Sequence, residues 1–591
     1  MTFIKSLHYC FKISWQSSKI CFLCRVIISL TTAVTPFFSV YLSKLIIDSI
    51  TNKNSNYIIF LLALLMFMNI LIGIVSDLST YLRDLHDEKL RNVVETKIME
   101  QTLNVDIAYF DSSEYLNSLQ AIKSNSYTLI SVIWNIFLLL SSFISFAIAI
   151  VSVASYNIYY VILIIIVTLP SACVDQSYAK KFHNWSIVNM GNERKKYYYQ
   201  NIACERCWAS DVRLYNLKNF ILTQYKSIWQ SVYNSKKSIL RKQFFVDSFA
   251  NFIPEIAIFI LSLNIISKIL TGHGTVGDYF FITGILSSLS SSIFALINAN
   301  VTIYKDRLNI LLLAKFEDFE SCIVDTGTME LKSDNIEIEF INVSFSYPNC
   351  KKKVLSNVSF KINAGEKICL IGINGSGKST IIKLLLRYYD VTAGEILING
   401  ICIKNYTLHS IRDSVSVLFQ DITLYATDLK ENIAISDVER TCNLEKEVIN
   451  SLRKAGSNRL LDKLPNGVNT YIHRIFNDDG YEPSGGEAQQ IGLARAIYRA
   501  RPLLVLDEPS SDLDPEAEAK MLNNIINMWK NKTVIFTSHR MSIVHLASRI
   551  FVLENGIIVE QGKHDKLLYE NGRYAYLYYL QTKNYSKNHL N

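Results

Sequence analysis

The sequence predicts an N-terminal all-α membrane domain of six transmembrane helices with long cytoplasmic extensions, followed by a C-terminal α/β domain with a phosphate-binding loop. Three observations lead to this fold class. The chain has 591 residues, too many for one compact domain, and 50% of them are hydrophobic. The apolar residues are concentrated in the first half, and a glycine-rich loop lies in the last third.

The first half contains six stretches that are long enough to cross a bilayer as helices. They cover residues 21–42, 57–76, 128–153, 158–174, 249–269 and 279–300. Pro36, Pro170 and Pro254 interrupt three of them, which bundled membrane helices tolerate because neighbouring groups satisfy the freed backbone. The first stretch is too long for a signal-peptide core and no small-residue cleavage site follows it, so we expect a retained helix.

Loop charge predicts the orientation in the membrane. Basic residues precede or begin the first span: Lys5, Lys12, Lys19 and Arg25. The long connections 77–126 and 175–243 are rich in Lys and Arg, whereas residues 155–157 carry no charge. Because basic loops stay in the cytoplasm, we expect both termini and both long connections there. The net charge of +8 is modest and spread over these loops, which favours an anionic inner leaflet over nucleic acid as the partner.

Two close cysteine pairs, Cys21/Cys24 and Cys204/Cys207, leave a four-thiolate zinc site open as an alternative. The pairs lie at the end of a membrane helix and in a cytoplasmic loop, where thiols stay reduced. Their spacing is common and nothing in the sequence brings them together, so packing roles are favoured.

Each long connection contains a short segment at which the helical pattern is interrupted. In the first, residues 84–103 have helical periodicity, and residues 106–111 break it as a short helix start capped by an acidic residue. In the second, residues 207–216 occupy the equivalent place. By pattern alone, an ordinary helical hairpin is the alternative.

The C-terminal part contains a strand, a phosphate loop and a helix start. The apolar run 368–371 leads into Gly372-Ile373-Asn374-Gly375-Ser376-Gly377-Lys378-Ser379. Glycines let the backbone wrap around a phosphate chain, and free amides at the helix start hold the anion. Lys378 reaches the outer phosphates and the Ser379 hydroxyl is a Mg²⁺ ligand. The loop therefore predicts binding of a nucleoside triphosphate.

A second apolar strand, residues 503–506, ends in two carboxylates, Asp507 and Glu508. Such a pair suits one acid for the metal and one for the attacking water, so Asp507 receives the metal role and Glu508 the base role. A phosphate loop alone would leave GTPases, kinases and helicases open.

The motifs around this pair resemble those of ABC-type ATPases. They are Tyr347, Gln420, Ser484-Gly485-Gly486-Glu487, Ser511 to Asp514, and His539. The Ser-Gly-Gly-Glu segment shortly before the two carboxylates separates this family from other phosphate-loop classes. In the family it is the signature that completes the ATP site of a partner subunit. The resemblance therefore implies that two copies sandwich two ATP molecules head to tail.

The resemblance also implies roles for single residues. The ATP-binding set is Tyr347, stacking on adenine, and Gly372, Asn374, Gly375, Ser376, Gly377, Lys378, Ser379 and Thr380 around the phosphates. The Mg²⁺ ligands are Ser379, Gln420 and Asp507, and the catalytic residues are Glu508, Gln420 and His539. Residues acting in trans are Ser484, Gly485, Gly486 and Glu487, and those of the D-loop between the two sites are Ser511, Asp512 and Asp514.

The signature departs from the family pattern at two positions. Pro483 stands where the family usually has Leu, and Glu487 where it usually has Gln. Glutamate occurs in a subgroup of bacterial exporters of peptides and drugs, which residues 476–480 also resemble. Proline fixes φ before the serine and bears on the strength of the trans contact, although the Ser and both Gly are present.

The order of six spans and then an ATPase domain in one chain resembles an exporter half-transporter. We expect a membrane domain at 1–312, a linker at 313–334, an ABC ATP-binding domain at 335–580 and a polar tail at 581–591. The two short segments of the long connections resemble the coupling segments of such exporters. The resemblance implies ATP-driven export across the cytoplasmic membrane of a bacterium, and an identical chain as partner, because two matching sites need no second gene product.

The signature and the polar residues in the membrane spans are the basis for ranking the candidate substrates. A bacteriocin-like or pheromone-like peptide stands ahead of lipids and hydrophobic drugs, and an ATP-gated channel or membrane regulator is the alternative class. Glu255 lies within the apolar fifth span, which suggests a contact for a cationic substrate, or else a hydrated residue at the membrane boundary. Asn298 belongs to the polar sixth span. There it would line a cavity for the substrate, or make polar contacts between packed helices.

Overall fold

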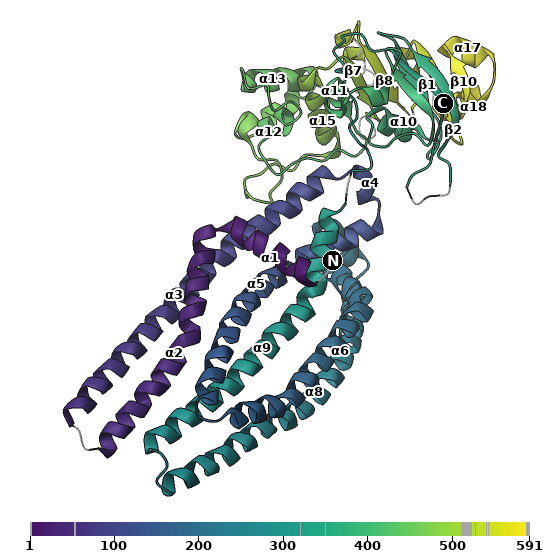
Figure 1. Ribbon diagram of the computed structural model, residues 1–591. Coiled ribbons are helices and arrows are strands. Elements are labelled where there is room, and N and C mark those ends of the chain that lie inside the picture. Colours follow the sequence, from purple (N-terminus) through teal and green to yellow (C-terminus); the bar gives the residue numbers. More distant parts are fainter. Residues whose placement is uncertain are drawn as a thin grey trace. The chain divides into compact units, whose positions relative to one another are not determined.

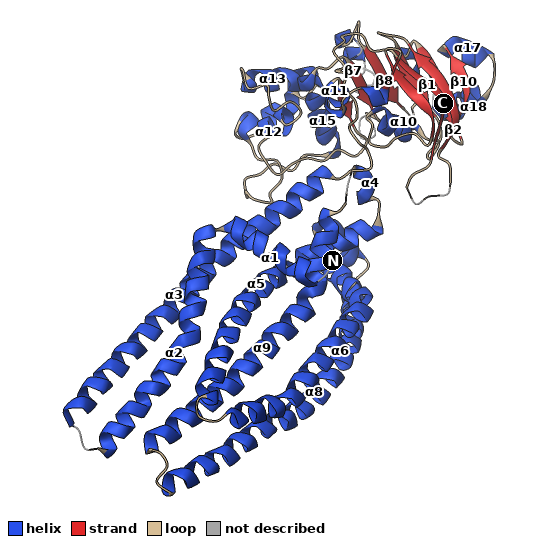
Figure 2. Cartoon of the chain, in the orientation of Figure 1, coloured by secondary structure: helices blue, strands red, loops and turns tan. Residues whose placement is uncertain are grey.

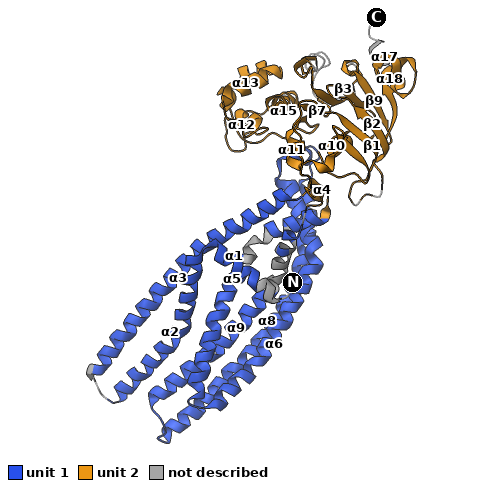
Figure 3. Cartoon of the chain, turned by 45° about the horizontal axis from the view of Figure 1, so that its top comes forward, with its two compact units in different colours: residues 1–105, 114–320 blue, residues 106–113, 321–591 orange. Residues whose placement is uncertain are grey.

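A computed structural model describes residues 3–52, 55–319, 321–348, 350, 352–509, 523–525, 527–538, 540, 541 and 543–586. The chain forms two compact units (Figure 3). The first contains residues 1–105 and 114–320, and the second contains residues 106–113 and 321–591. The interrupting segment of the first long connection therefore packs with the C-terminal unit and not with the helices that flank it in sequence.

Helices make up the first unit as far as the structure describes it (Figures 1 and 2). They are α1 (Phe3–Ser17), α2 (Lys19–Thr51), α3 (Ser55–Asn104), α5 (Ser113–Ala154), α6 (Ile158–Cys204), α7 (Ala209–Leu214), α8 (Lys218–Leu270) and α9 (Val276–Glu317), with a 3-10 turn at Arg206–Trp208. Six of them, α2, α3, α5, α6, α8 and α9, are long and apolar enough to cross a membrane. This confirms the six predicted spans.

Three helices are long enough to form the predicted extensions of the membrane domain. α3, α6 and α8 contain 50, 47 and 53 residues. At about 1.5 Å per residue they are roughly 70–80 Å long, more than twice a bilayer core of about 30 Å. Pro170 and Pro254 lie inside α6 and α8 without ending them. α6 packs along both α8 and α9, and α2 along both α3 and α9, so partner helices support these interruptions.

The second unit combines two sheets with helices (Figure 2). One sheet has the order β2-β1-β4-β5 and the other β10-β9-β3-β8-β7-β6. The strands are β1 (Ile338–Phe345), β2 (Leu355–Ile362), β3 (Lys367–Ile371), β4 (Ala393–Ile398), β5 (Ile401–Cys402), β6 (Val415–Leu418), β7 (Leu503–Leu506), β8 (Thr533–Thr537), β9 (Arg549–Glu554) and β10 (Ile557–Gly562). The helices include α4 (Ile107–Phe110), α10 (Lys378–Leu385), α11 (Leu408–Asp413), α12 (Leu429–Ala434), α13 (Leu444–Lys454), α14 (Asn458–Lys463), α15 (Gly485–Arg499), α17 (His564–Tyr569) and α18 (Arg573–Ser586).

The larger sheet positions the site. β3, β8, β7 and β6 are parallel neighbours, and β7 and β8 are buried along their whole length, as expected for strands covered on both faces. Their carboxyl ends meet at one edge, which is where ligands bind in open parallel sheets. The phosphate loop follows β3 and the two carboxylates follow β7. The hairpin between β9 and β10 turns at Asn555, with φ 49°, and Gly556, with φ 76°.

The acidic cap predicted for the short helix in the first connection is wrong in one respect. Asp106 occupies the N-cap position of α4, but its side chain does not accept a hydrogen bond from that helix. Its Oδ1 accepts from Ser321 Oγ at 2.7 Å and its Oδ2 from the Ile323 backbone N–H at 2.9 Å. The carboxylate bonds these distant partners in place of the helix N–H groups, because they satisfy both of its oxygens.

The cysteine pairs lie in different surroundings. Cys21 is buried in α2 and Cys24 half-buried, whereas Cys204 and Cys207 are exposed. Over the described residues, no group of three or more His, Cys, Asp or Glu side chains is placed to hold a metal ion. The zinc alternative gains no support.

Candidate functional site

The phosphate loop runs from the end of β3 to the start of α10. Glycine is required at several of its positions, for two separate reasons. Gly375 and Gly377 have φ of 77° and 109°, which favour glycine. A Cβ on Gly372 would lie 2.4 Å from the Leu553 carbonyl oxygen, and one on Gly377 would lie 2.6 Å from Leu355 Cδ2. Side chains at these positions would push the loop out of its curve.

The loop fits a bound triphosphate. Lys378 is 5% exposed, and its Nζ donates to the Gly372 carbonyl at 2.9 Å across the loop. Burial lowers the pKa of Lys378, while the nearby Glu508 and Asp507 carboxylates act in the opposite direction. The Ser376 hydroxyl is buried without a hydrogen-bond partner in the described structure. A buried ammonium and an unpaired hydroxyl in one glycine-rich loop suit an anion with several oxygens.

Three strand ends bring Gln420, Asp507 and Glu508 together. Gln420 follows β6, and its Nε2 donates to Glu508 Oε2 at 2.9 Å. Thr537, the last residue of β8, accepts from the Glu508 backbone N–H at 2.8 Å and donates to Asp507 Oδ1 at 2.8 Å. Thr537 thus fixes both carboxylate residues. Sequence reasoning gave Thr537 no role in the site, because its contacts depend on β7 and β8 being neighbours.

Glu508 has an unusual backbone. Its φ is 49°, in the left-handed region that non-glycine residues seldom adopt. Such strain persists where the surroundings enforce it, and here the hydrogen bonds to Thr537 and Gln420 do so. Strain of this kind clusters at active sites, which supports a catalytic role for Glu508.

The described residues can also hold a divalent metal. Asp507 is 5% exposed at the carboxyl end of β7, and Ser379 lies in the first turn of α10. Together with the Gln420 side chain they supply carboxylate, hydroxyl and amide oxygens, the ligands that Mg²⁺ prefers.

Tyr347 follows β1 and is held beside the start of α10. Its hydroxyl and Thr380 Oγ1 are 3.1 Å apart and share a hydrogen bond. The edges of the Phe345 and Tyr389 rings meet its ring, with centroids 5.0 and 5.2 Å away. Tyr347 is half-buried, so these contacts fix the ring while part of it stays open.

Tyr389 links this aromatic group to α4. Its hydroxyl donates to Asp111 Oδ2 at 2.6 Å, and burial and the Asp111 carboxylate raise the pKa of the hydroxyl, which stays protonated. A cavity of about 340 Å³ lies beside this bond and is lined by Ala108, Tyr109, Phe345, Tyr389 and others. The structure thus connects the Tyr347 ring with the interrupting segment through one side chain. Sequence reasoning did not identify Tyr389.

The signature segment forms the start of α15. Ser484 is the N-cap, its side chain accepts from the Glu487 N–H, and the Glu487 carboxylate accepts from the Ser484 N–H at 2.9 Å. This is a capping box, and its Ser-x-x-Glu pattern is visible in the sequence. Glu487, noted there only as a departure from the family, thus has a structural role. Pro483 precedes a serine whose φ of −67° and ψ of 164° are those of an ordinary N-cap.

Glu487 accepts further hydrogen bonds that sequence reasoning missed. Lys463 Nζ lies 2.7 Å from its Oε1, and the Tyr481 hydroxyl donates over 3.0 Å. Burial alone would raise the pKa of Glu487, but hydrogen bonds from Lys463, from the N–H and hydroxyl of Ser484, and from Tyr481 lower it to about 2. The carboxylate is therefore charged at neutral pH.

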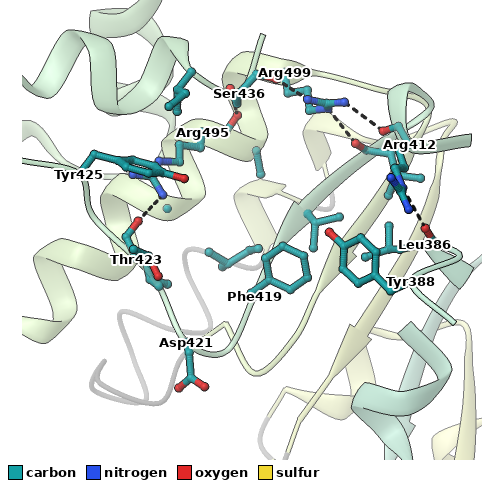
Figure 4. A pocket seen from close by; sticks show the side chains of 17 residues that line it. Leu386, Tyr388, Arg412, Phe419, Asp421, Thr423, Tyr425, Ser436, Arg495 and Arg499 are labelled. Carbon is teal, nitrogen blue, oxygen red and sulfur yellow. Dashed lines mark hydrogen bonds between the residues drawn. The ribbon is translucent and has the colours of Figure 1, made fainter. Parts of the chain in front are cut away.

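A groove of about 420 Å³ lies around Phe419 and Asp421 (Figure 4). Phe419 and Asp421, the two neighbours of Gln420, line it together with aromatic and basic side chains. Three arginines of its wall are fixed by backbone carbonyls: Arg412 by Arg387, Arg495 by Thr423, and Arg499 by Ser436. Arg495 also lies over the Tyr425 ring. The wall of the groove is therefore held in place by hydrogen bonds, next to Gln420 in the sequence.

Ser511, Asp512, Asp514 and His539 lie outside the described residues. Two other predicted residues lie in the membrane unit. Glu255 on α8 and Asn298 on α9 are exposed on their helices. A cavity of about 150 Å³ in the membrane unit is lined by Gln176, Asn300 and Tyr304, among others.

Comparison with known proteins matches both units. The family model described as ABC transporter transmembrane region matches residues 21–293, and the model described as ABC transporter matches residues 355–511. A solved structure of a bacterial Atm1-family ABC exporter with ATP bound has a TM-score of 0.78 and 20% identity. It covers 94% of this chain and 97% of that chain, which shows a shared fold over nearly the whole length.

Two curated relatives match over nearly their full length. The subtilin transport ATP-binding protein of Bacillus subtilis is 30% identical over 96% of this chain and 92% of its own. The nisin transport ATP-binding protein of Lactococcus lactis subsp. lactis is 24% identical over 96% and 95%. An ATP-dependent lipid A-core flippase of Escherichia coli strain K12 is 37% identical, over 44% of this chain and 43% of its own.

The match to the subtilin relative and the two family models agree with the site, where a phosphate loop, a metal-suited aspartate and a strained glutamate meet. Six apolar helices make this a multi-pass membrane protein, with its ATPase domain on the cytoplasmic side. The chain belongs to the ABC transporter family, as an ATP-hydrolysing half-transporter that carries one membrane domain and one ATPase domain.

Proposed function

We propose that two copies of this chain form an exporter that moves a bacteriocin-like peptide out of a bacterial cytoplasm by alternating access. The observation that carries this proposal is the full-length similarity to two bacteriocin transport proteins, those named for subtilin and nisin. The lipid flippase resembles less than half of the chain. Similarity that includes the membrane domain bears on the substrate, because that domain would contact it.

Each proposed role in hydrolysis uses residues of this site. Lys378 and the loop amides hold the phosphates, Tyr347 stacks on adenine, and Glu508 accepts a hydrogen bond from the attacking water. Ser379, Gln420 and Asp507 would hold Mg²⁺, which when bound neutralises phosphate charge. His539, Ser511, Asp512 and Asp514 keep the family roles proposed for them.

The proposed dimer explains the exposed signature. Ser484 and Gly485 are exposed at the N-terminus of a helix of 15 residues. The free amides and the positive end of this helix favour an anion. In the head-to-tail dimer the anion is the ATP held by the partner, with Gly486 and Glu487 alongside.

A groove and an exposed helix suit coupling between chains. Trp208, Leu214 and Tyr215 in and around α7 are 39%, 74% and 67% exposed. Apolar side chains gathered on one short helix indicate a docking surface. We propose that this segment of one chain docks in the groove beside Gln420 of the other. ATP would then bind the closed dimer better and shift the membrane domains toward the outward state.

The test is transport by the purified chain in inside-out proteoliposomes, with bacteriocin-type peptides, fluorescent lipids and cationic drugs offered separately. We expect ATP-dependent peptide uptake and peptide-stimulated hydrolysis, both absent in Glu508→Gln. Uptake of lipids or drugs alone would contradict the peptide assignment. ATP-dependent ion conductance without uptake would instead favour a channel or regulator.

Replacing Tyr389 with Phe should weaken coupling. The ring contacts with Tyr347 are kept, but the hydrogen bond to Asp111 is lost. We expect the ratio of peptide-stimulated to basal hydrolysis to fall by about tenfold, the order of one hydrogen bond to a charged group. Tyr406→Phe is the control, because it removes a hydroxyl that bonds only the Ile398 carbonyl. An unchanged ratio would contradict a coupling role for Tyr389.

A further inference from the structure

The start of α15 combines two features that conflict in a site for phosphate. The exposed Ser484 and Gly485 and the helix amides attract an anion. Yet Glu487, a carboxylate in the first turn, lies 3.0 Å from the Ser484 hydroxyl that would contact the anion. A negative charge at that distance opposes the approach of a triphosphate.

The Ser484 hydroxyl is also engaged in this arrangement. It donates to Glu487 Oε2 at 3.0 Å. To donate to a phosphate oxygen it must release Glu487, and the carboxylate then needs other donors. Releasing a buried acceptor without replacement is costly.

Lys463 supplies a charge that compensates Glu487, and Lys463 and Tyr481 both supply hydrogen-bond donors to its carboxylate. Lys463, the last residue of α14, places its ammonium 2.7 Å from Glu487 Oε1, and the Tyr481 hydroxyl lies 3.0 and 3.1 Å from the two carboxylate oxygens. The Glu487 side chain is 14% exposed and that of Lys463 is 57% exposed, so the carboxylate is shielded from water while the ammonium reaches it from the surface. Both donors remain when the Ser484 hydroxyl turns away.

We propose that Lys463 is a positioning residue for the signature segment, whose ammonium neutralises Glu487 so that Ser484 can approach the triphosphate held by the partner chain. Tyr481 supports it by keeping the carboxylate hydrogen-bonded. The inference rests on the proposed head-to-tail dimer and assigns to it a residue outside the signature itself.

The test measures ATP retention by the full-length protein in nanodiscs, in a Glu508→Gln background that prevents turnover. The variants are Lys463→Met, Glu487→Gln and the two combined. Lys463→Met leaves the Glu487 charge uncompensated, and we expect the ATP concentration for half-maximal retention to rise by about tenfold. In the combined variant the charge is absent, so that concentration should return to within about threefold of Glu487→Gln alone.

Two further measurements separate positioning from stability. Lys430→Met is the matched control, since Lys430 pairs with Asp428 and Asn469 away from Glu487. It should leave the ATP concentration unchanged. The melting temperature of each variant shows whether α15 has lost its fold. In the hydrolysing protein, Lys463→Met should raise KM more than it lowers kcat, because it weakens engagement and not the chemistry.

The inference is overturned if Lys463→Met leaves ATP retention unchanged, or if its defect persists in the combined variant. Persistence would mean that Lys463 acts on the nucleotide directly or on the fold. If the wild-type chain does not hydrolyse ATP and the Glu508→Gln variant does not retain it, both the proposed function and this inference are overturned. Normal hydrolysis with unaffected Lys463 variants would overturn the inference alone.

Discussion

Glu508→Gln should abolish ATP hydrolysis and leave ATP binding intact. Glu508 is the carboxylate at the end of β7 that would orient and deprotonate the attacking water. Loss of a general base lowers the rate by about 10²–10⁴-fold. The substituting amide keeps nearly the same shape, and its oxygen still accepts from Gln420 Nε2. Lys378 and the loop glycines, which would hold the phosphates, are unchanged.

Phosphate release and filter binding of labelled ATP measure the two halves of this prediction. Glu395→Gln is the matched control, because Glu395 is an exposed carboxylate on β4 of the same unit. It should alter neither quantity. Hydrolysis that survives Glu508→Gln would show that the base lies elsewhere. Lost ATP binding would show that Glu508 supports the loop and would contradict its assignment as the base.

The fold was predictable where one local pattern decides. β7 was predicted at 503–506, with the bounds it has, because buried parallel strands are continuous apolar runs. The six spans follow from the lengths of their apolar stretches. The side chain of Asp106 was not predictable, because its partners Ser321 and Ile323 lie more than 200 residues away.

The candidate site also contains residues that a local motif predicts and residues that only the fold brings together. The phosphate loop is a contiguous motif, so its residues could be named one by one from the sequence. Thr537, Tyr389 and Lys463 matter because separate elements bring them to Asp507, Asp111 and Glu487. No spacing in the sequence encodes these contacts. Glu487 is the intermediate case, since its Ser-x-x-Glu pattern is local but the family comparison drew attention to its departure and not to its cap.

A linked dimer with two lesions should show whether the signature acts in trans. The first lesion is Lys378→Ala, which removes phosphate binding. The second is Gly485→Asp. Gly485 is the exposed first residue of α15, and its φ is not positive. An aspartate at this first helical position is stabilised by the helix dipole. Its charge, which has no Lys463 to neutralise it, repels the triphosphate of the partner by several kcal/mol, more than about a hundredfold.

The placement of the two lesions predicts opposite results. In a head-to-tail dimer, both lesions on one chain damage both sites, one through its phosphate loop and the other through its signature. Lesions on different chains fall in the same site and leave the other intact. The first protein should therefore trap no ADP with vanadate after incubation with ATP, and the second about half of the wild-type amount if the sites are independent. Gly485→Asn in place of Gly485→Asp is the control, with similar size and no charge, and should restore trapping in the first protein to about half. The reverse order would mean that each signature serves its own chain. Equal trapping by the two proteins would mean that the signature serves neither site, because only a signature that contributes to a site makes the result depend on the placement of the lesions.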